Sequence, residues 1–256
     1  MTALLAVFAG LLGAAMGSFL NVVVHRVPRG ISLVHPPSSC PACETEIRSV
    51  DNIPIVSWLV LRGRCRACEA PISPRYPVVE AVTTALWVIA VFRFERLEEA
   101  AFVASAATVL WALSLIDVEY RRIPNVIVVP ATAAASVWVL GAAAAGGEPR
   151  MLARAAACGA GFFVLLFLIA VVSGGMGFGD VKLGAFVGVV LGRFGVATAV
   201  AGVLTGFILG GLVAAALLVL RRRGRKDALP FGPAMAGGAV IALFGGERLV
   251  RTWLGV

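Results

Sequence analysis

The amino-acid sequence predicts an all-α polytopic membrane protein with about eight transmembrane helices. Hydrophobic residues make up 60% of the 256 residues, whereas a typical soluble domain has about 45–50%. The mean hydropathy of the chain is +0.95. Uncharged apolar stretches recur along the sequence, and proline or glycine separates several of them. These features exclude an ordinary soluble globular domain.

The first predicted span, residues 2–24, contains 23 residues without a charge, which is about 34 Å of helix. It lacks a basic segment before the apolar run and is longer than the apolar part of a typical signal peptide, so we expect a retained helix with its N-terminus outside. Residues 25–76 form a long polar loop, and residues 77–256 a membrane core of seven helices. These seven spans are predicted near residues 77–92, 99–116, 126–145, 154–173, 181–194, 196–220 and 231–246.

The distribution of basic residues supports this topology. With the N-terminus outside, four segments face inward, and they carry seven, two, one and five of the 22 Lys and Arg residues. The segments are 25–76, 117–125, 174–180 with Lys182 at its edge, and 221–230. Cytoplasmic segments of membrane proteins carry such an excess. Topology therefore accounts for the net charge of +8, and we expect the lipid bilayer, not nucleic acid, as a partner.

Two Cys-x-x-Cys pairs, Cys40 with Cys43 and Cys65 with Cys68, lie in the predicted cytoplasmic loop. Two such pairs can complete a tetrahedral zinc site, and a closed set of four thiolates leaves no open position for catalysis. The spacing therefore predicts a structural zinc ion that stabilises a loop too small for a core of its own. A thiol redox pair is the alternative. The fifth cysteine, Cys158, falls in an apolar span and is interpreted as a packing residue.

Asp180 follows a glycine-rich stretch between two apolar segments. Four of the six residues before it are glycine, and they bring no side chains that would block a substrate backbone. An ionisable group placed between apolar spans is a candidate functional group, because burying a charge in a membrane is costly. The alternative is a glycine-rich hinge with a solvated Asp. The span after Asp180 is short, only 13 residues from Val181 to Arg193.

Asp117 is a candidate partner for Asp180. It is the first charge after the apolar stretch 100–116, and the predicted topology places both acids at the same side of the membrane. Two carboxylates that share a proton can activate water, since both cannot be ionised at close range. The alternative for Asp117 is an ordinary carboxylate at a helix end beside Arg121 and Arg122.

These motifs resemble those of a known family. Gly177-Phe178-Gly179-Asp180 is similar to the Gly-x-Gly-Asp signature of intramembrane aspartic proteases, and the longer stretch through Lys182 resembles the prepilin peptidases, also called type IV leader peptidases. Further motifs follow the order of that family over nearly the whole chain. They are residues 17–28, the two Cys-x-x-Cys pairs, residues 74–77, Asp117 with its flank, and residues 230–233.

The resemblance implies a membrane aspartic endopeptidase with Asp117 and Asp180 as catalytic residues, and Gly177, Gly179 and Lys182 as supporting motif residues. It implies cleavage of the short leader of type IV prepilins or pseudopilins at the cytoplasmic face of the bacterial inner membrane. Many members then methylate the new N-terminus with S-adenosylmethionine, but the sequence shows no nucleotide-binding motif for that cofactor.

Two other classes of function are compatible with parts of the sequence. Asp117 and Asp180 could form the relay of a proton-coupled transporter, although no pair of broken helices in matching halves is visible. Alternatively, the cysteine loop could belong to a scaffold without catalysis. Two further charged residues, Glu80 and Lys182, each have two possible roles. Glu80 is either a functional acid or a helix N-terminal acid, and Lys182 either pairs with Asp180 or extends to the membrane interface.

Overall fold

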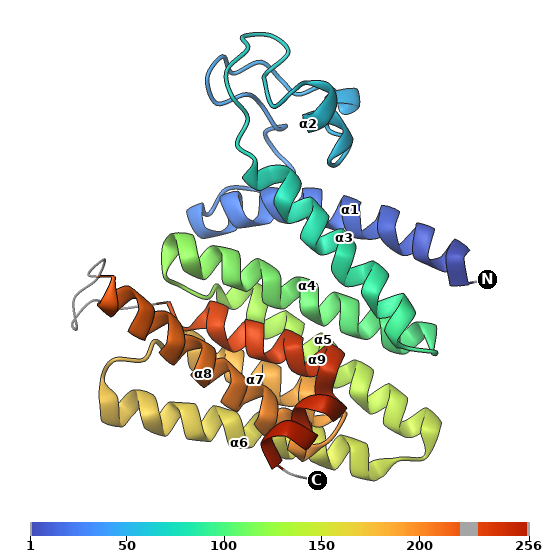
Figure 1. The fold of residues 1–256 in the computed structure, drawn as a ribbon, viewed down its shortest axis with the longest axis vertical. Coiled ribbons are helices and arrows are strands. Elements are labelled where there is room, and N and C mark those ends of the chain that lie inside the picture. The colour runs from blue at the N-terminus through green and yellow to red at the C-terminus, as the bar shows by residue number, and fades with distance from the viewer. Residues whose placement is uncertain (1, 221–229, 255–256) are drawn as a thin grey trace. The chain divides into compact units, whose positions relative to one another are not determined.

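The computed structural model describes residues 2–220 and 230–254, and their regular structure is helical throughout (Figure 1). The α-helices are α1 (Thr2–Arg26), α2 (Val56–Val60), α3 (Arg75–Arg93), α4 (Leu97–Tyr120), α5 (Asn125–Gly146), α6 (Pro149–Ser173), α7 (Phe178–Gly192), α8 (Val196–Val219) and α9 (Gly232–Leu254). Two 3-10 turns, η1 (Val27–Arg29) and η2 (Ser49–Asp51), lie in the polar loop. The predicted all-α class is confirmed.

Six helices are long and apolar enough to cross a membrane, namely α1, α3, α4, α5, α6 and α8, where the first span includes η1. The protein is therefore a multi-pass membrane protein. The predicted number of eight spans is not confirmed, because α7 has 15 residues and the apolar part of α9 is the short stretch Gly232–Gly246. At about 1.5 Å per residue, 15 residues give about 22 Å of helix, against about 30 Å of hydrocarbon.

The chain divides into two compact units, Met1–Thr108 and Val109–Val256, with the boundary inside α4. In the first unit α1 packs along α3 (Figure 1). A Cβ atom at Gly17 would lie 2.6 Å from the Glu80 Cα, and one at Gly13 would lie 2.9 Å from the Thr84 Cα. Only glycine permits this backbone approach, as in other closely packed membrane helices.

In the second unit α7 lies at the centre, in contact with α5, α6, α8 and α9. Ten of its 15 residues are buried. Glycine again allows close contact: a Cβ at Gly188 would collide with the backbone of Cys158 in α6, and Gly238 of α9 lies against Gly206 of α8. Because neighbouring helices surround α7, protein rather than lipid covers most of this short helix.

Two boundaries differ from the sequence-based expectation. The helix that carries Asp117 continues to Tyr120, so this residue lies inside the last turn of α4 and not just beyond a span. α9 extends to Leu254, past the expected end near 246, with a break in helical geometry at Gly245. The basic segment predicted at residues 221–230 lies, except for Pro230, outside the described residues.

Candidate active site and metal centre

The Asp117 carboxylate lies buried near the end of α4, with only 5% of the residue exposed. Its Oδ2 atom accepts a hydrogen bond of 3.0 Å from the backbone N–H of Gly232. Gly232 is the first residue of α9, where backbone N–H groups have no partner within the helix and carry a partial positive charge. The start of α9 therefore stabilises a negative charge on Asp117.

Asp180 lies in the first turn of α7, three residues after the N-cap residue Gly177. Asp180 is partly exposed. Gly174 and Gly175, which precede α7, are exposed and lie outside the helices. The Asp117 carboxylate lies close enough to that of Asp180 for the two charges to repel each other. The fold thus brings together the two acids that the sequence singled out, from the end of one helix and the start of another.

Small residues close the site around both carboxylates. A Cβ atom at Gly232 would lie 2.7 Å from the Asp117 Oδ2 atom, so a side chain there would displace the carboxylate. A Cβ at Gly179 would lie 3.0 Å from the Cβ of Ile123, which follows α4. At Gly177 the nearest atom would be Asp180 Oδ2, at 3.5 Å. Gly179 and Gly232 therefore let the start of α7 and the start of α9 approach the end of α4.

Lys182 is hydrogen-bonded to Asn125 and not to Asp180. Its Nζ atom donates a hydrogen bond of 2.7 Å to the Asn125 side-chain oxygen, at the start of α5. The same ammonium group lies 4.7 Å from the centre of the Phe178 ring. Lys182 therefore links the start of α5 to the start of α7, two residues after Asp180.

The four cysteines of the loop, Cys40, Cys43, Cys65 and Cys68, converge in the first unit. Their sulfur atoms all lie within 4.8 Å of one another, and the Cys40 and Cys68 sulfurs are 3.8 Å apart. A zinc ion bonded to four sulfurs at about 2.3 Å in a tetrahedron requires about 3.8 Å between sulfurs. The donor set and spacing therefore fit a tetrahedral metal ion, and this cluster could hold one.

The two cysteine pairs have the same backbone structure, displaced by 25 residues. In the first, the Cys40 N–H donates to Thr45 O and the Glu44 N–H donates to Cys40 O. In the second, the Cys65 N–H donates to Ala70 O and the Glu69 N–H donates to Cys65 O. The isolated bridges Ser39–Glu46 and Arg64–Pro71 repeat the same offset. The loop thus contains two equivalent knuckles, each of which presents two sulfur atoms.

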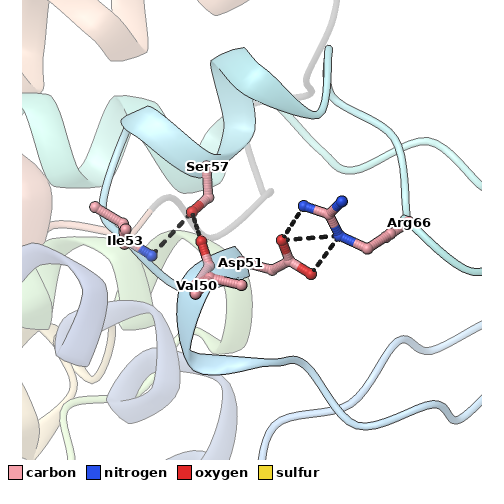
Figure 2. Close-up of polar contacts among 5 residues, drawn as sticks. All are labelled: Val50, Asp51, Ile53, Ser57 and Arg66. Atoms are coloured by element: carbon pink, nitrogen blue, oxygen red, sulfur yellow. Dashed lines mark hydrogen bonds and ion pairs between the residues drawn. The ribbon is translucent and has the colours of Figure 1, made fainter.

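Side-chain contacts hold the segment between the knuckles (Figure 2). Arg66 donates to both carboxylate oxygens of Asp51, and its Nη2 atom lies 2.6 Å from Oδ1. Hydrogen bonding by Arg66 lowers the pKa of Asp51 below its usual value. Ser57 donates to the Val50 carbonyl and accepts from the Ile53 N–H, both at 2.9 Å.

Hydrogen bonding favours the thiolate form at two of the four cysteines of the metal cluster, Cys43 and Cys65. Hydrogen bonding with the side chain and backbone of Thr45 lowers the pKa of Cys43 to about 6. Backbone hydrogen bonds from Cys68 and Ala67 lower the pKa of Cys65. Metal ions bind cysteine as the thiolate, so these contacts favour metal binding by one cysteine of each knuckle. At Cys68 a backbone hydrogen bond with Ala70 lowers the pKa, but hydrogen bonding with the neighbouring cysteines and burial raise it to about 12. Cys158, by contrast, is buried in α6 against Gly192 of α7, as expected for a packing residue.

The sequence did not reveal the contacts of three residues: Gly232, Asn125 and Glu80. Gly232 belongs to a motif that the resemblance included, but nothing in the sequence shows that its N–H reaches Asp117, 115 residues away. Asn125 gave no signal as the partner of Lys182, since the two are 57 residues apart. Glu80 was left open between two roles, and the structure shows its carboxylate accepting the Ile55 N–H at 2.6 Å.

Two models of known protein families match the chain. Residues 11–94 match the model of the bacterial Peptidase A24 N-terminal domain, and residues 104–220 match that of the type IV leader peptidase family. No solved structure matches the chain.

Three curated relatives carry the name prepilin leader peptidase/N-methyltransferase. The protein of Bacillus subtilis (strain 168) is 32% identical over 94% of this chain and 95% of its own length. The protein of Pseudomonas aeruginosa is 34% identical over 95% of this chain and 91% of its own length. The protein of Burkholderia pseudomallei (strain 1026b) is 35% identical over 93% of this chain and 85% of its own length. This chain therefore belongs to the type IV leader peptidase family.

Proposed function

We propose that the protein is a membrane aspartic endopeptidase that removes the short leader of type IV prepilins or pseudopilins. The observation that carries this proposal is that Asp117 and Asp180 lie within electrostatic reach of each other, with the Gly232 N–H on one carboxylate and a glycine-rich, exposed segment beside the other. Family membership supplies the class of reaction, and the names of the relatives supply the substrate class.

In this mechanism the two carboxylates share one proton. The ionised group accepts a proton from a water molecule as that water attacks the scissile carbonyl, and the protonated group donates a hydrogen bond to the developing oxyanion. The Gly232 N–H stabilises the charged form of Asp117. The pair titrates as a unit, so the roles of base and acid belong to the pair rather than to one residue.

The scissile peptide must be extended to reach both carboxylates. Gly174 and Gly175 have no side chains and are exposed just before α7, which leaves room for a substrate backbone beside Asp180. We place this side of the protein at the cytoplasmic face of the bacterial inner membrane, with the N-terminus outside. The excess of Lys and Arg in the predicted inner segments supports that orientation.

We propose zinc as the metal of the four-cysteine cluster, in a structural role. Residues Cys40, Cys43, Cys65 and Cys68 would hold it, and the ion would supply the cross-link that joins the two knuckles. A closed shell of four thiolates has no site for water or substrate. We accordingly divide the chain by function into a first helix (1–24), a metal-binding loop (25–76) and a catalytic core (77–256).

The decisive experiment replaces each acid separately. Asp117→Asn and Asp180→Asn should each lower prepilin cleavage by about 10²–10⁴-fold or more, because asparagine cannot share the proton or act as the base. Purified variants in detergent, offered a prepilin-type peptide, provide the measurement, and metal content confirms that the loop is folded. Substantial cleavage by either variant would remove that residue from the mechanism.

N-methylation of the new N-terminus is a separate proposal, and it rests on the names of the relatives. It requires S-adenosylmethionine, and the polar loop is a candidate contributor to that site. If cleavage and methyl transfer occur at different centres, the Asp180→Asn variant should still transfer labelled methyl groups to a mature-form pilin peptide. Absence of transfer by the wild-type protein would leave a peptidase alone.

A further inference from the structure

The short helix α2 exposes an apolar face that no part of the described chain covers. Val56, Leu59 and Val60 are 52%, 61% and 70% exposed, and their spacing places them on one side of the helix. The opposite side faces the loop: Ser57 is buried, and the Trp58 indole N–H donates to the Ile72 carbonyl at 3.1 Å. Val50 and Ile53, which precede the helix, are also exposed.

Basic residues lie directly beside this apolar face. An open hollow next to α2 is lined by Val60, Leu61, Arg62, Arg64 and Arg66, with one acid, Glu69, and it borders Cys65 of the metal cluster. Arg66 is paired with Asp51. The side chains of Arg62 and Arg64 are exposed and have no hydrogen-bond or ion-pair partner within the described part of the chain. The hollow therefore offers two guanidinium groups without a direct partner, against one acid, Glu69, next to three exposed aliphatic side chains.

The position of α2 is fixed relative to a membrane helix. The Ile55 N–H, just before α2, donates to Glu80, which lies five residues inside α3 or about 7.5 Å from its start. Ile55 is the centre of a classic γ-turn, with φ 63°, ψ −51° and a Val56 N–H to Pro54 O bond of 2.6 Å. This turn is rare and strained. Glu80 therefore holds a costly backbone conformation at the residue before α2 and ties this residue to α3. Figure 1 shows α2 in the loop that precedes α3.

We propose that α2 and its arginine hollow form a docking surface for anionic phospholipids. α3 is apolar enough to cross the bilayer, so a segment tied to its second turn lies at the depth of the headgroups. There, aliphatic side chains enter the acyl boundary and arginines contact phosphate groups. Val56, Leu59 and Val60 would enter the lipid, and Arg62 and Arg64 would bind the headgroups. This surface anchors the metal-binding loop to the membrane and does not depend on the catalytic assignment.

Hydrogen exchange of the full-length protein in lipid nanodiscs tests this surface. We compare discs of phosphatidylcholine with discs that also contain phosphatidylglycerol, and follow peptides that cover residues 53–66. The anionic discs should slow exchange of these peptides by about fivefold or more, since each arginine near an anionic surface contributes about a fivefold preference. High salt should abolish the difference, because salt screens exposed charges.

Substitutions separate the two components of the surface. Arg62→Gln with Arg64→Gln should remove the difference between the two kinds of disc, and Leu59→Ser with Val60→Ser should speed exchange in both. Val34→Ser and Arg48→Gln, exposed residues elsewhere in the loop, are the matched controls and should change neither. Exchange of the first knuckle, residues 40–47, reports in the same experiment whether each variant is folded.

Three outcomes would overturn the proposal. The first is equal exchange of residues 53–66 in the two kinds of disc for the wild-type protein. The second is protection that increases with protein concentration and not with lipid charge, which would assign the face to a second copy of the chain. The third is protection that appears only when a prepilin peptide is added, which would assign it to substrate.

Discussion

The four-cysteine cluster takes its residues from a short stretch of sequence, whereas the carboxylate site takes its groups from three distant helices. Cys40 and Cys68 are 28 residues apart, and each knuckle closes on itself through backbone hydrogen bonds within six residues. Asp117 and its Gly232 partner are 115 residues apart. Local backbone structure therefore prepares the metal cluster, and helix packing alone prepares the carboxylate pair.

This difference means that damage to one site should not directly change the geometry of the other. Damage to a knuckle removes a cross-link but leaves the packing of α4, α7 and α9 in place. Damage to a glycine at the carboxylate site shifts a helix but leaves the sulfur atoms unmoved. The following predictions test that independence, from the largest expected effect to the smallest.

Replacing one cysteine should eliminate the metal. Cys40→Ser or Cys68→Ser should lower the zinc content from one per chain to nearly none, because three thiolates bind zinc far less tightly than four. The loop should become sensitive to protease, and prepilin cleavage should decline only as the loop unfolds. Metal analysis and limited proteolysis provide the measurements.

The Cys158→Ser variant, with its substitution in α6, is the matched control and should keep its zinc. Full stability of a protein without metal would contradict the structural role. Immediate and complete loss of cleavage with an intact loop would contradict the independence of the two sites.

A methyl group at Gly232 should damage the carboxylate site without affecting the metal. The Gly232→Ala side chain would contact Asp117 Oδ2 and weaken a hydrogen bond to a charged group, which contributes about 1.5–3 kcal/mol. We expect cleavage to fall by about ten- to a hundredfold, with zinc content unchanged. Steady-state kinetics with a prepilin peptide measure the loss.

Gly237→Ala is the control on the same helix. Its Cβ would meet only the Leu209 Cδ1 atom at 3.5 Å, an ordinary contact. Activity of that variant should stay within a small factor of wild type. If both variants lost the same activity, a general disturbance of α9 would explain the result better than the contact with Asp117.

The smallest effect is expected at the ion pair of Asp51 and Arg66. Arg66 lowers the pKa of Asp51 in the folded protein, so the unfolded chain takes up the proton first as the pH falls. The pair thus stabilises the loop fully above the usual Asp pKa of about 3.9 and loses that contribution as the pH falls through the lowered value. The effect is small because Arg66 is 51% exposed.

The comparison of wild type with Asp51→Asn tests this pair. Exchange of loop peptides should differ slightly at neutral pH, and the difference should shrink below about pH 3.9. Acid also protonates the cysteines, but it does so in both proteins, so the difference between them isolates Asp51. If the difference in exchange between wild type and Asp51→Asn grew as the pH fell, the stabilising role of this ion pair would be contradicted.

Several features could be predicted because they depend on local pattern. Apolar stretches determine helices through the cost of exposing backbone groups to lipid, and a helix lies at each of the seven later predicted spans, although α9 runs on to Leu254. Five of these seven helices are long and apolar enough to cross a membrane. Cys-x-x-Cys spacing is short enough to dictate a knuckle. Asp117 and Asp180 were singled out because a charge among apolar residues is costly. This cost can be recognised from the sequence without knowing which groups each carboxylate contacts.

Other features depend on which helices pack together, and the sequence alone did not reveal them. The Gly232 N–H meets Asp117, Lys182 bonds Asn125 rather than Asp180, and Glu80 supports a strained turn at Ile55. Apolar periodicity tells which residues avoid water, but in a membrane protein lipid and protein are equally apolar neighbours. The amino-acid sequence by itself thus determined the helices, the knuckles and the two acids, and only the tertiary structure decided their partners, because close helix packing rests on small shape differences.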